Sequence, residues 1–241
     1  MNPQQHSSDL IFWDVDTQFD FMTPAERGGK LYVRDPADAG DEGAVKLIPA
    51  LSELSRFATR NDVLRVATGD WHRLDHREID TETPDFRTTF PPHCLAGEVG
   101  STKVPETKLR DTLVLPLRAD PAVAWDVARR AVREGRDIFV QKEEFSCFLG
   151  NPATGALLEA LNPKAIVVYG VALDVCVKAA VEGMLERGWN VFVVADATCG
   201  LGLEDPESLI SSWERRGASR VTTDGIISGA VPPTAELTQS V

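Results

Sequence analysis

The stretch Ala165-Ile-Val-Val-Tyr-Gly-Val-Ala-Leu-Asp-Val-Cys-Val177 indicates the fold class of this chain. It joins a short apolar run to a glycine and then to a helical pattern that contains Cys176. Near-continuous apolar runs of this length are typical of strands whose two faces are both covered by helices. A cysteine at the start of the following helix meets the positive end of the helix dipole, which favours the thiolate. The stretch therefore predicts an α/β fold with a nucleophile just past the end of a strand.

Apolar runs of strand length recur along the chain, with helical patterns between them. The expected strands are 9–16, 62–68, 137–141, 165–170, 190–195 and 219–222, and the expected helices are 43–60, 121–134, 152–160, 174–187 and 206–216. This alternation predicts a parallel sheet in a three-layer α/β/α domain. We expect one domain over 9–230, with flexible termini at 1–8 and 231–241. The segment 74–118 has little helical period, and a loop that long is usually functional.

Composition narrows the classes of protein to which the chain belongs. With 241 residues, 43% of them hydrophobic, it can bury a substantial core. A net charge of −12 and the lack of any basic run argue against a nucleic-acid surface. No apolar stretch is long enough to cross a bilayer, and the polar N-terminus lacks a signal core. We therefore expect a cytoplasmic protein that binds neither nucleic acid nor membrane.

The four cysteines, Cys94, Cys147, Cys176 and Cys199, are widely spaced and form no Cys-x-x-Cys pair. This pattern predicts reduced thiols rather than a disulfide framework. A structural zinc site built on Cys94, Cys147 or Cys199 is a weak alternative, because the spacing matches no zinc-finger pattern. Cys147 and Cys199 are interpreted as packing residues.

Three ionisable residues stand where separate strands are expected to end: Asp16, Lys142 and Cys176. Ligands bind at the carboxyl ends of the strands in open α/β sheets, so these side chains are expected to meet at one edge. Together they suit acyl transfer, in which the thiolate attacks a carbonyl carbon, the carboxylate moves the proton and the ammonium holds the charged pair. Taken singly, each also suits a structural role in packing, turn capping or surface charge.

A second set of residues has the spacing of a metal site. Asp70 and His72 project to the same side of an extended segment, so both can bind one divalent ion. His93, in the long loop, is the candidate third ligand, which leaves positions open for water and substrate. His76 is a candidate outer or auxiliary ligand. The alternative is a pair of surface histidines with a capping aspartate.

Aromatic residues stand close to these positions in the sequence. They are Phe21, Trp71, Phe90 and Phe145. A flat ring substrate would find edge and face contacts among them. Each of them also suits packing beneath the long loop.

Five ordered motifs resemble the cysteine hydrolases of the isochorismatase-like superfamily, and most closely the nicotinamidase branch. They are Val15-Asp-Thr-Gln-Phe-Asp-Phe21, Asp70-Trp-His72, Phe90-Pro-Pro-His-Cys94, Lys142 and Gly170-Val-Ala-Leu-Asp-Val-Cys-Val177. The resemblance runs over residues 9–227. It implies a Rossmann-like α/β/α fold with a six-stranded parallel sheet, and a homo-oligomer.

The resemblance also implies the roles of the catalytic residues. Asp16, Lys142 and Cys176 would form the triad of the family. The family has a cis peptide bond before its oxyanion-hole residue, and this bond would join Val171 to Ala172 here. The oxyanion donors would then be the N–H groups of Ala172 and Cys176.

The metal and the substrate follow from the same resemblance. A divalent ion, usually zinc but also iron or manganese, would bind Asp70, His72 and His93 and orient the pyridine nitrogen of nicotinamide. The chain departs from the family at Leu173, where nicotinamidases generally have threonine, and at Phe90, where tryptophan is frequent. These departures concern the pocket walls, so the chemistry transfers better than the substrate.

The resulting hypothesis is a metal-assisted cysteine amidohydrolase that releases ammonia from nicotinamide or a related small heteroaromatic carboxamide through a thioester. One alternative is a metal-independent hydrolase of ureido or carbamoyl substrates, such as an N-carbamoyl amino acid or a biuret-like compound. Those relatives typically lack the Asp-x-His and Pro-Pro-His ligands. An isochorismatase proper would not need Cys176. The last alternative is a non-catalytic binding protein on the same fold. No organic cofactor is expected.

Overall fold

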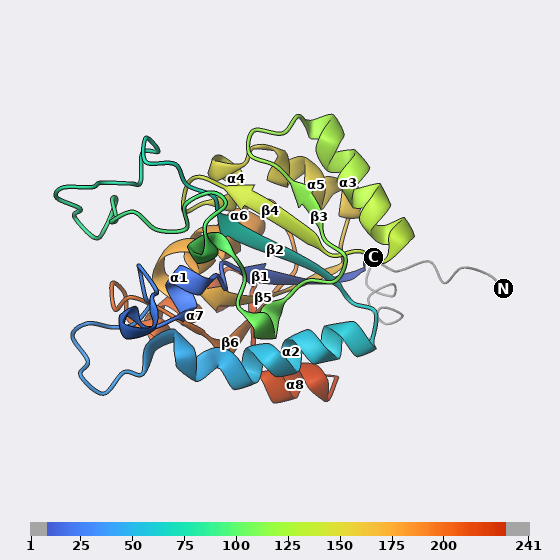
Figure 1. Ribbon diagram of the computed structural model, residues 1–241. Helices are drawn as coiled ribbons and strands as arrows, with labels where there is room; N and C mark the ends of the chain where they lie inside the picture. Colours follow the sequence, from blue (N-terminus) through green and yellow to red (C-terminus); the bar gives the residue numbers. More distant parts are fainter. Residues whose placement is uncertain (1–8, 230–241) are drawn as a thin grey trace.

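The computed structural model describes residues 9–229, which form a seven-stranded sheet with helices on both faces (Figure 1). The strands are β1 Leu10–Val15, β2 Leu64–Asp70, β3 Leu113–Leu115, β4 Ile138–Lys142, β5 Ala165–Val171, β6 Val191–Cys199 and β7 Ser219–Val221. The α-helices are α1 Phe19–Met22, α2 Ile48–Arg60, α3 Pro121–Glu134, α4 Cys147–Gly150, α5 Ala153–Leu161, α6 Lys178–Glu186, α7 Pro206–Glu214 and α8 Thr223–Ile227. A π-helical turn, η5, covers Leu173–Val177, and short 3-10 turns cover Ala25–Arg27, Gly43–Leu47, Val99–Ser101 and Pro105–Thr107.

All seven strands are parallel, in the order β3-β4-β2-β1-β5-β6-β7. The chain starts in the middle of the sheet with β1, adds β2, β4 and β3 on one side, and then crosses to add β5, β6 and β7 on the other. The direction of winding therefore changes between β1 and β5. In open α/β sheets a ligand crevice forms at such a switch point, outside the carboxyl ends of the strands.

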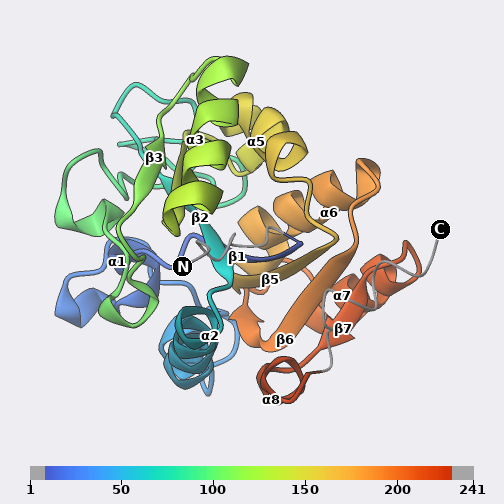
Figure 2. The same cartoon turned by 90° about the vertical axis from the view of Figure 1, so that its right-hand side faces the viewer.

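Helices cover the two faces of the sheet unequally, as the view in Figure 2 shows. On one face α3, α4, α5, α6 and α7 contribute to one apolar cluster, and on the other α2 and α8 contribute to a second. Both faces of the sheet are therefore shielded from water by helices, which explains the near-continuous apolar runs in the sequence.

Helix α3 illustrates how local sequence determines these elements. Pro121 stands at its first position, where the missing N–H costs nothing, and Gly135 ends it in the left-handed region with φ 66°. Its buried residues, Ala124, Val127, Ala128 and Ala131, repeat with helical spacing and face the core. Helices 121–134 and 206–216 were expected within two residues of their observed bounds.

The α/β class is confirmed, but the expectation of six strands is wrong. The additional strand, β3, lies inside the segment 74–118 that was interpreted as a loop. It has three residues, and Val114 in its middle is exposed at the sheet edge. A run this short has no readable periodicity, so only its pairing with β4 identifies it as a strand.

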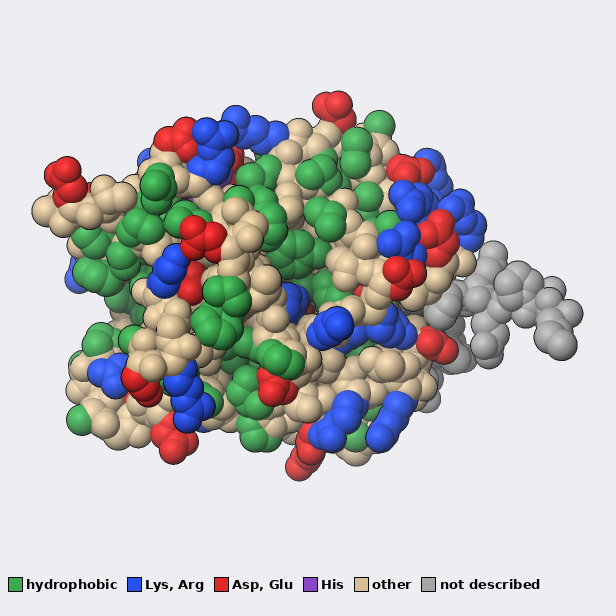
Figure 3. Space-filling model, viewed as in Figure 1, with side chains coloured by type: hydrophobic (Ala, Val, Ile, Leu, Met, Phe, Trp, Pro, Cys, Tyr) green, Lys and Arg blue, Asp and Glu red, His purple; other side chains and the backbone are tan. Residues whose placement is uncertain are grey.

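The surface of the described region carries both charged and apolar side chains. Charged side chains of both signs are spread over the face in Figure 3, between apolar patches. Within residues 9–229, none of the helices combines the length and apolar character that crossing a bilayer requires.

Since one sheet organises this whole region, we propose that it is a single domain. The flexible termini expected at 1–8 and 231–241 lie outside the described residues.

Candidate active site

The catalytic candidates come together because neighbouring strands end side by side. Asp70 is the last residue of β2 and Lys142 the last of β4, and the two are register partners across the strand pair. Asp16 directly follows β1 in the left-handed region, with φ 49°. All three side chains are almost completely buried. Their meeting at the carboxyl edge of the sheet agrees with the expectation from strand ends.

Lys142 is the centre of this group. Its Nζ lies 2.9 Å from Asp16 Oδ2 and 3.6 Å from Cys176 Sγ, and it also donates to Asp70 Oδ1. Thr68 donates to the other oxygen of Asp16 at 2.6 Å. Oxygens of Asp16 and Asp70 lie within 4.8 Å of the Cys176 sulfur. A carboxylate, an ammonium and a thiol therefore share one buried volume, close enough for proton exchange.

Burial and neighbouring charges shift the pKa values of these groups in opposite directions. Burial raises the pKa of Asp16 above its ordinary value, although Lys142 opposes this. Burial also opposes ionisation of Asp70, but Lys142 and His72 outweigh it and hold the pKa of Asp70 well below the ordinary range. The two carboxylates overcome the burial of Lys142 and raise its pKa. The lysine is therefore a permanent cation at neutral pH.

The expectation of a thiolate favoured by a helix N-terminus is wrong for this arrangement. Burial raises the pKa of Cys176 well above its ordinary value, and Lys142 only partly opposes that effect. Cys176 is the fourth residue of η5, a five-residue π-helical turn, rather than the first residue of a long helix. A buried thiol of raised pKa needs a base before it can act as a nucleophile, and Asp16 lies close enough to serve as one.

The backbone before Cys176 runs close to the neighbouring strand. Gly170 has φ 118°, and a Cβ there would lie 2.0 Å from the carbonyl oxygen of Val15. Only glycine suits both constraints. The peptide bond between Val171 and Ala172 is cis, at the position that the family resemblance implied. The Ala172 carbonyl accepts N–H groups of the turn that presents Cys176.

Asp70, His72 and His93 form the second cluster. Each offers one ligand atom, and these atoms lie within 4.8 Å of one another. Asp70 Oδ2 is 3.5 Å from Nε2 of both histidines, whereas Asp70 Oδ1 faces Lys142. The two oxygens of one carboxylate thus divide between the lysine and the histidines.

The donor set fits a divalent metal. Both ring nitrogens of His72 are buried without a hydrogen-bond partner, which is costly unless another group satisfies them. His93 Nδ1 lies 2.7 Å from the Pro91 carbonyl, a contact that leaves Nε2 free to ligate. Two imidazoles and a carboxylate are typical of zinc, iron and manganese sites. His76 stands outside the cluster, since its Nε2 pairs with Glu143 Oε2 at 3.3 Å.

The two clusters open on one small, mostly apolar cavity of about 30 Å³. Its lining residues are Phe21, Leu31, Val33, Asp70, Phe90, His93, Phe145, Ala172, Val175, Cys176 and Leu201. Three of the four expected aromatic residues therefore line it, and the rings of Phe90 and Phe145 pack edge to face with centroids 5.7 Å apart. Leu31, Val33, Val175 and Leu201 escaped sequence interpretation because they are ordinary apolar residues in loops and turns.

Trp71 is the exception among the aromatic expectations. It contacts Phe139 and lines a different groove, together with Lys103 and Pro105. Alternate residues of an extended segment point to opposite sides, so Trp71 must face away from Asp70 and His72. The expectation that Trp71 contacts the substrate is therefore wrong.

The cysteine-based zinc alternative also finds no support among residues 9–229. The metal-compatible clusters found there include none of Cys94, Cys147 and Cys199. Cys147 and Cys199 pack in the apolar clusters, as expected, and Cys94 donates its S–H to the Gly100 carbonyl at 3.5 Å. All three thiols are free and buried.

Several polar residues that support the site were not singled out from the sequence. Gln18 accepts the Asp70 N–H at 2.7 Å and donates to the Asp70 carbonyl at 2.8 Å, which fixes the end of β2. Glu78 accepts the Phe145 N–H at 2.7 Å through its side chain and the Phe90 N–H at 2.8 Å through its carbonyl. Gln18 stands within the first family motif, which was the available signal, whereas Glu78 has no such signal.

Comparison with known proteins gives a consistent family. Residues 10–225 match the family model described as the isochorismatase domain. A nicotinamidase/pyrazinamidase of Mycobacterium tuberculosis (strain ATCC 25618 / H37Rv) is 29% identical over 195 residues, which cover 79% of this chain and 86% of the relative.

Solved structures share the fold. The pyrazinamidase of Pyrococcus horikoshii in complex with zinc has a TM-score of 0.63 and 24% identity, and the match covers 89% of this chain and 99% of that one. N-carbamoylsarcosine amidase from Thermoplasma acidophilum has a TM-score of 0.61 and 17% identity, with 90% and 97% of the two chains covered. One fold thus serves proteins named for different amides, and the choice among them depends on the cavity.

Proposed function

Because this chain belongs to the isochorismatase family, we propose that it is a cysteine amidohydrolase that releases ammonia from nicotinamide or a closely related heteroaromatic carboxamide. The enzyme class expected from the sequence, a hydrolase of non-peptide amides, agrees with this membership and with the mycobacterial relative. The observation that carries the proposal is the position of Lys142, whose Nζ lies 2.9 Å from Asp16 and 3.6 Å from Cys176, a residue that lines an apolar cavity.

The proposed reaction begins with proton transfer from the Cys176 thiol to Asp16. The Lys142 ammonium stabilises the thiolate that forms, and the sulfur attacks the carboxamide carbon. The N–H groups of Ala172 and Cys176 would donate to the oxyanion. Asp16 returns the proton to the leaving nitrogen, the C–N bond breaks and ammonia departs, leaving a thioester. A water molecule, deprotonated by Asp16, then releases the carboxylic acid and restores the thiol.

Asp70, His72 and His93 would hold a divalent metal, most simply zinc, which would supply a Lewis acid for a ring nitrogen of the substrate. The protein side chains provide the remaining selectivity. The described residues that line the cavity include aromatic and aliphatic groups but no arginine or lysine. Among these lining side chains, a carboxylate of an N-carbamoyl amino acid would find no cationic partner. The cavity therefore favours an uncharged ring over a ureido acid.

Ammonia release from four amides tests the proposal: nicotinamide, pyrazinamide, an N-carbamoyl amino acid and biuret. We expect turnover of the two ring carboxamides, its loss in Cys176→Ala, and its loss after dialysis against a chelator. Turnover of the carbamoyl compounds alone, unaffected by chelator, would favour the metal-independent alternative. No ammonia from any amide, with Cys176 no more reactive toward iodoacetamide than Cys147, would favour a binding protein.

The expected homo-oligomer and cytoplasmic location stay predictions. Light scattering of the purified protein tests the first, and cell fractionation tests the second.

A further inference from the structure

Asp174 joins the turn that carries Cys176 to the loop that follows β6. Its side chain is buried, and its carboxylate accepts the Leu201 N–H at 2.9 and 3.0 Å and the Leu203 N–H at 2.8 Å. Hydrogen bonds to an ionised acceptor are stronger than neutral ones. One carboxylate, two residues before the nucleophile, therefore determines where this loop lies.

Gly200 is adapted to the same contact. A Cβ at this position would lie 2.7 Å from Asp174 Oδ1 and 2.9 Å from Asp174 Oδ2, closer than side chains approach one another. Its backbone is not in the left-handed region, so space rather than conformation requires glycine here. The carboxylate and the loop are packed directly against each other.

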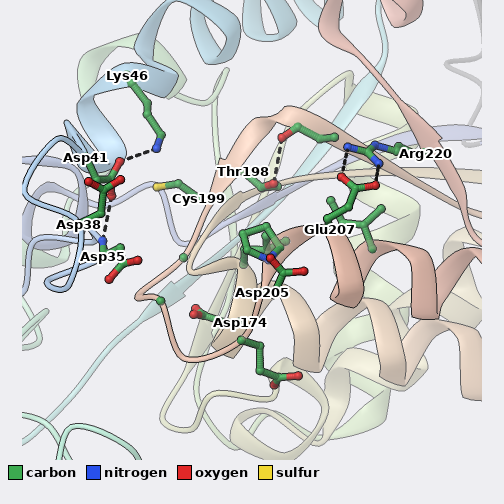
Figure 4. A pocket seen from close by; sticks show the side chains of 17 residues that line it. Asp35, Asp38, Asp41, Lys46, Asp174, Thr198, Cys199, Asp205, Glu207 and Arg220 are labelled. Carbon is green, nitrogen blue, oxygen red and sulfur yellow. Dashed lines mark hydrogen bonds and ion pairs between the residues drawn. The ribbon is translucent and has the colours of Figure 1, made fainter.

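The loop separates two cavities. Leu201 lines the small cavity that contains Cys176, whereas Gly200 and Gly202 line a second cavity of about 620 Å³. Figure 4 shows Asp174 among the side chains that line this second cavity. The loop thus has the small cavity on one side and the larger cavity on the other. Without an anchor, Leu201 has room to move outward.

We propose that Asp174 is a positioning residue that holds Leu201 as a wall of the substrate cavity and so restricts the enzyme to carboxamides of one unsubstituted ring. The inference rests on the proposed function and specifies its substrate class. The cavity is small, at about 30 Å³, and one additional methyl group in a well-packed apolar pocket changes kcat/KM by about 10–200-fold. Release of the loop should remove most of that discrimination.

The test compares kcat and KM for nicotinamide, methyl-substituted nicotinamides and a quinoline carboxamide. Asp174→Ala should raise the kcat/KM ratio of substituted to unsubstituted amide by about tenfold or more, mainly through KM. Gly200→Ala should act in the same direction, because its Cβ displaces the carboxylate. Asp174→Asn retains one acceptor oxygen and should be intermediate. The control is Asp196→Ala, which removes an exposed carboxylate that accepts the Thr223 N–H at 2.8 Å and lines neither cavity; its ratio should equal that of the wild type.

The outcomes distinguish a failure of the role proposed for Asp174 from a failure of the proposed function. Ammonia release with an unchanged ratio in every folded variant at positions 174 and 200 would overturn the role of Asp174 and leave the proposed function intact. No ammonia from any carboxamide with the wild type would overturn both. If Asp174→Ala does not fold, Asp174→Asn and Gly200→Ala decide the question. A ratio that also rises in Asp196→Ala would show general loosening and would refute a specific clamp.

Discussion

Replacing Asp16 by asparagine should remove the base of the proposed reaction while leaving the shape of the site in place. Asp16 accepts hydrogen bonds from Thr68 at 2.6 Å and pairs with Lys142 at 2.9 Å. Asparagine has the same size and can still accept from one of these donors, but it cannot take the proton of the buried Cys176 thiol. Because burial raises the pKa of that thiol, the thiolate does not form readily without a base.

The expected loss is large in catalysis and smaller in stability. A positioned general base contributes about 10²–10⁴-fold to the rate, so kcat should fall by that factor, equivalent to about 2.7–5.5 kcal/mol. The free energy of unfolding should fall by about 1.5–3 kcal/mol, the worth of a hydrogen bond to a charged group. Lys142 keeps its second carboxylate partner, Asp70, which limits the structural cost.

Asp14, on β1 two residues before Asp16, offers a matched control. It is also buried, accepts a hydrogen bond from a threonine, Thr17, at 2.8 Å, and pairs with a lysine, Lys103, at 2.9 Å. Among the described residues Lys103 has no second carboxylate within ion-pair distance, so Asp14→Asn should cost about 3–5 kcal/mol of stability. Its activity, once folded, should stay within about tenfold of the wild type.

We therefore expect the two variants to rank in opposite order for stability and for activity. Urea unfolding should show Asp14→Asn as the less stable protein, and ammonia release should show Asp16→Asn as the less active one. Elemental analysis should show the same metal content in both variants as in the wild type. Activity of Asp16→Asn within tenfold of the wild type, or an equal loss in folded Asp14→Asn, would refute the assignment of Asp16 as the base.

Three further predictions concern pH, metal and stability. Asp16 must be ionised to act as the base, and burial raises its pKa. We therefore expect kcat/KM to reach its maximum above that pKa and to fall as the pH drops through it. A fall in kcat/KM that begins only at or below pH 3.8, the ordinary pKa of an aspartate, would contradict this. His93→Ala should weaken metal binding by at least about tenfold, measured as metal per chain after dialysis, and a metal content equal to the wild type would exclude His93 as a ligand. Asp137→Ala should lower the free energy of unfolding by about 3–5 kcal/mol, because this buried carboxylate pairs with Arg65 at 2.6 Å and Arg110 at 3.1 Å, while kcat in the folded protein stays the same; a smaller loss in urea unfolding counts against the pair.

Much of the fold and the reaction centre could be predicted because the relevant signals are local. Apolar runs of five to nine residues between helical patterns identify the longer strands of a parallel sheet. Once the strands are parallel, their carboxyl ends share an edge, and residues that follow them in sequence become neighbours in space. This is why the sequence alone predicts that Asp16, Lys142 and Cys176 lie together.

Other features could not be predicted because they depend on packing between distant segments. The strand β3 has three residues and exists only through its pairing with β4. Leu201 lines the cavity, and its N–H donates to Asp174, which lies in the turn after β5, far from Leu201 in the sequence. The pKa of Cys176 is raised by burial, a property of everything around the thiol rather than of its place in a helix.

The amino-acid sequence by itself determined the α/β class, the position of Cys176 after β5 and the grouping of carboxylate, lysine and histidine residues at one sheet edge, since each follows from periodicity and strand polarity. Only the tertiary structure decided that Trp71 faces away from the cluster of Asp70, His72 and His93, that burial raises the pKa of Cys176 and how small the cavity is. Desolvation and shape are sums over all neighbouring atoms, and those neighbours are known only once the chain has folded.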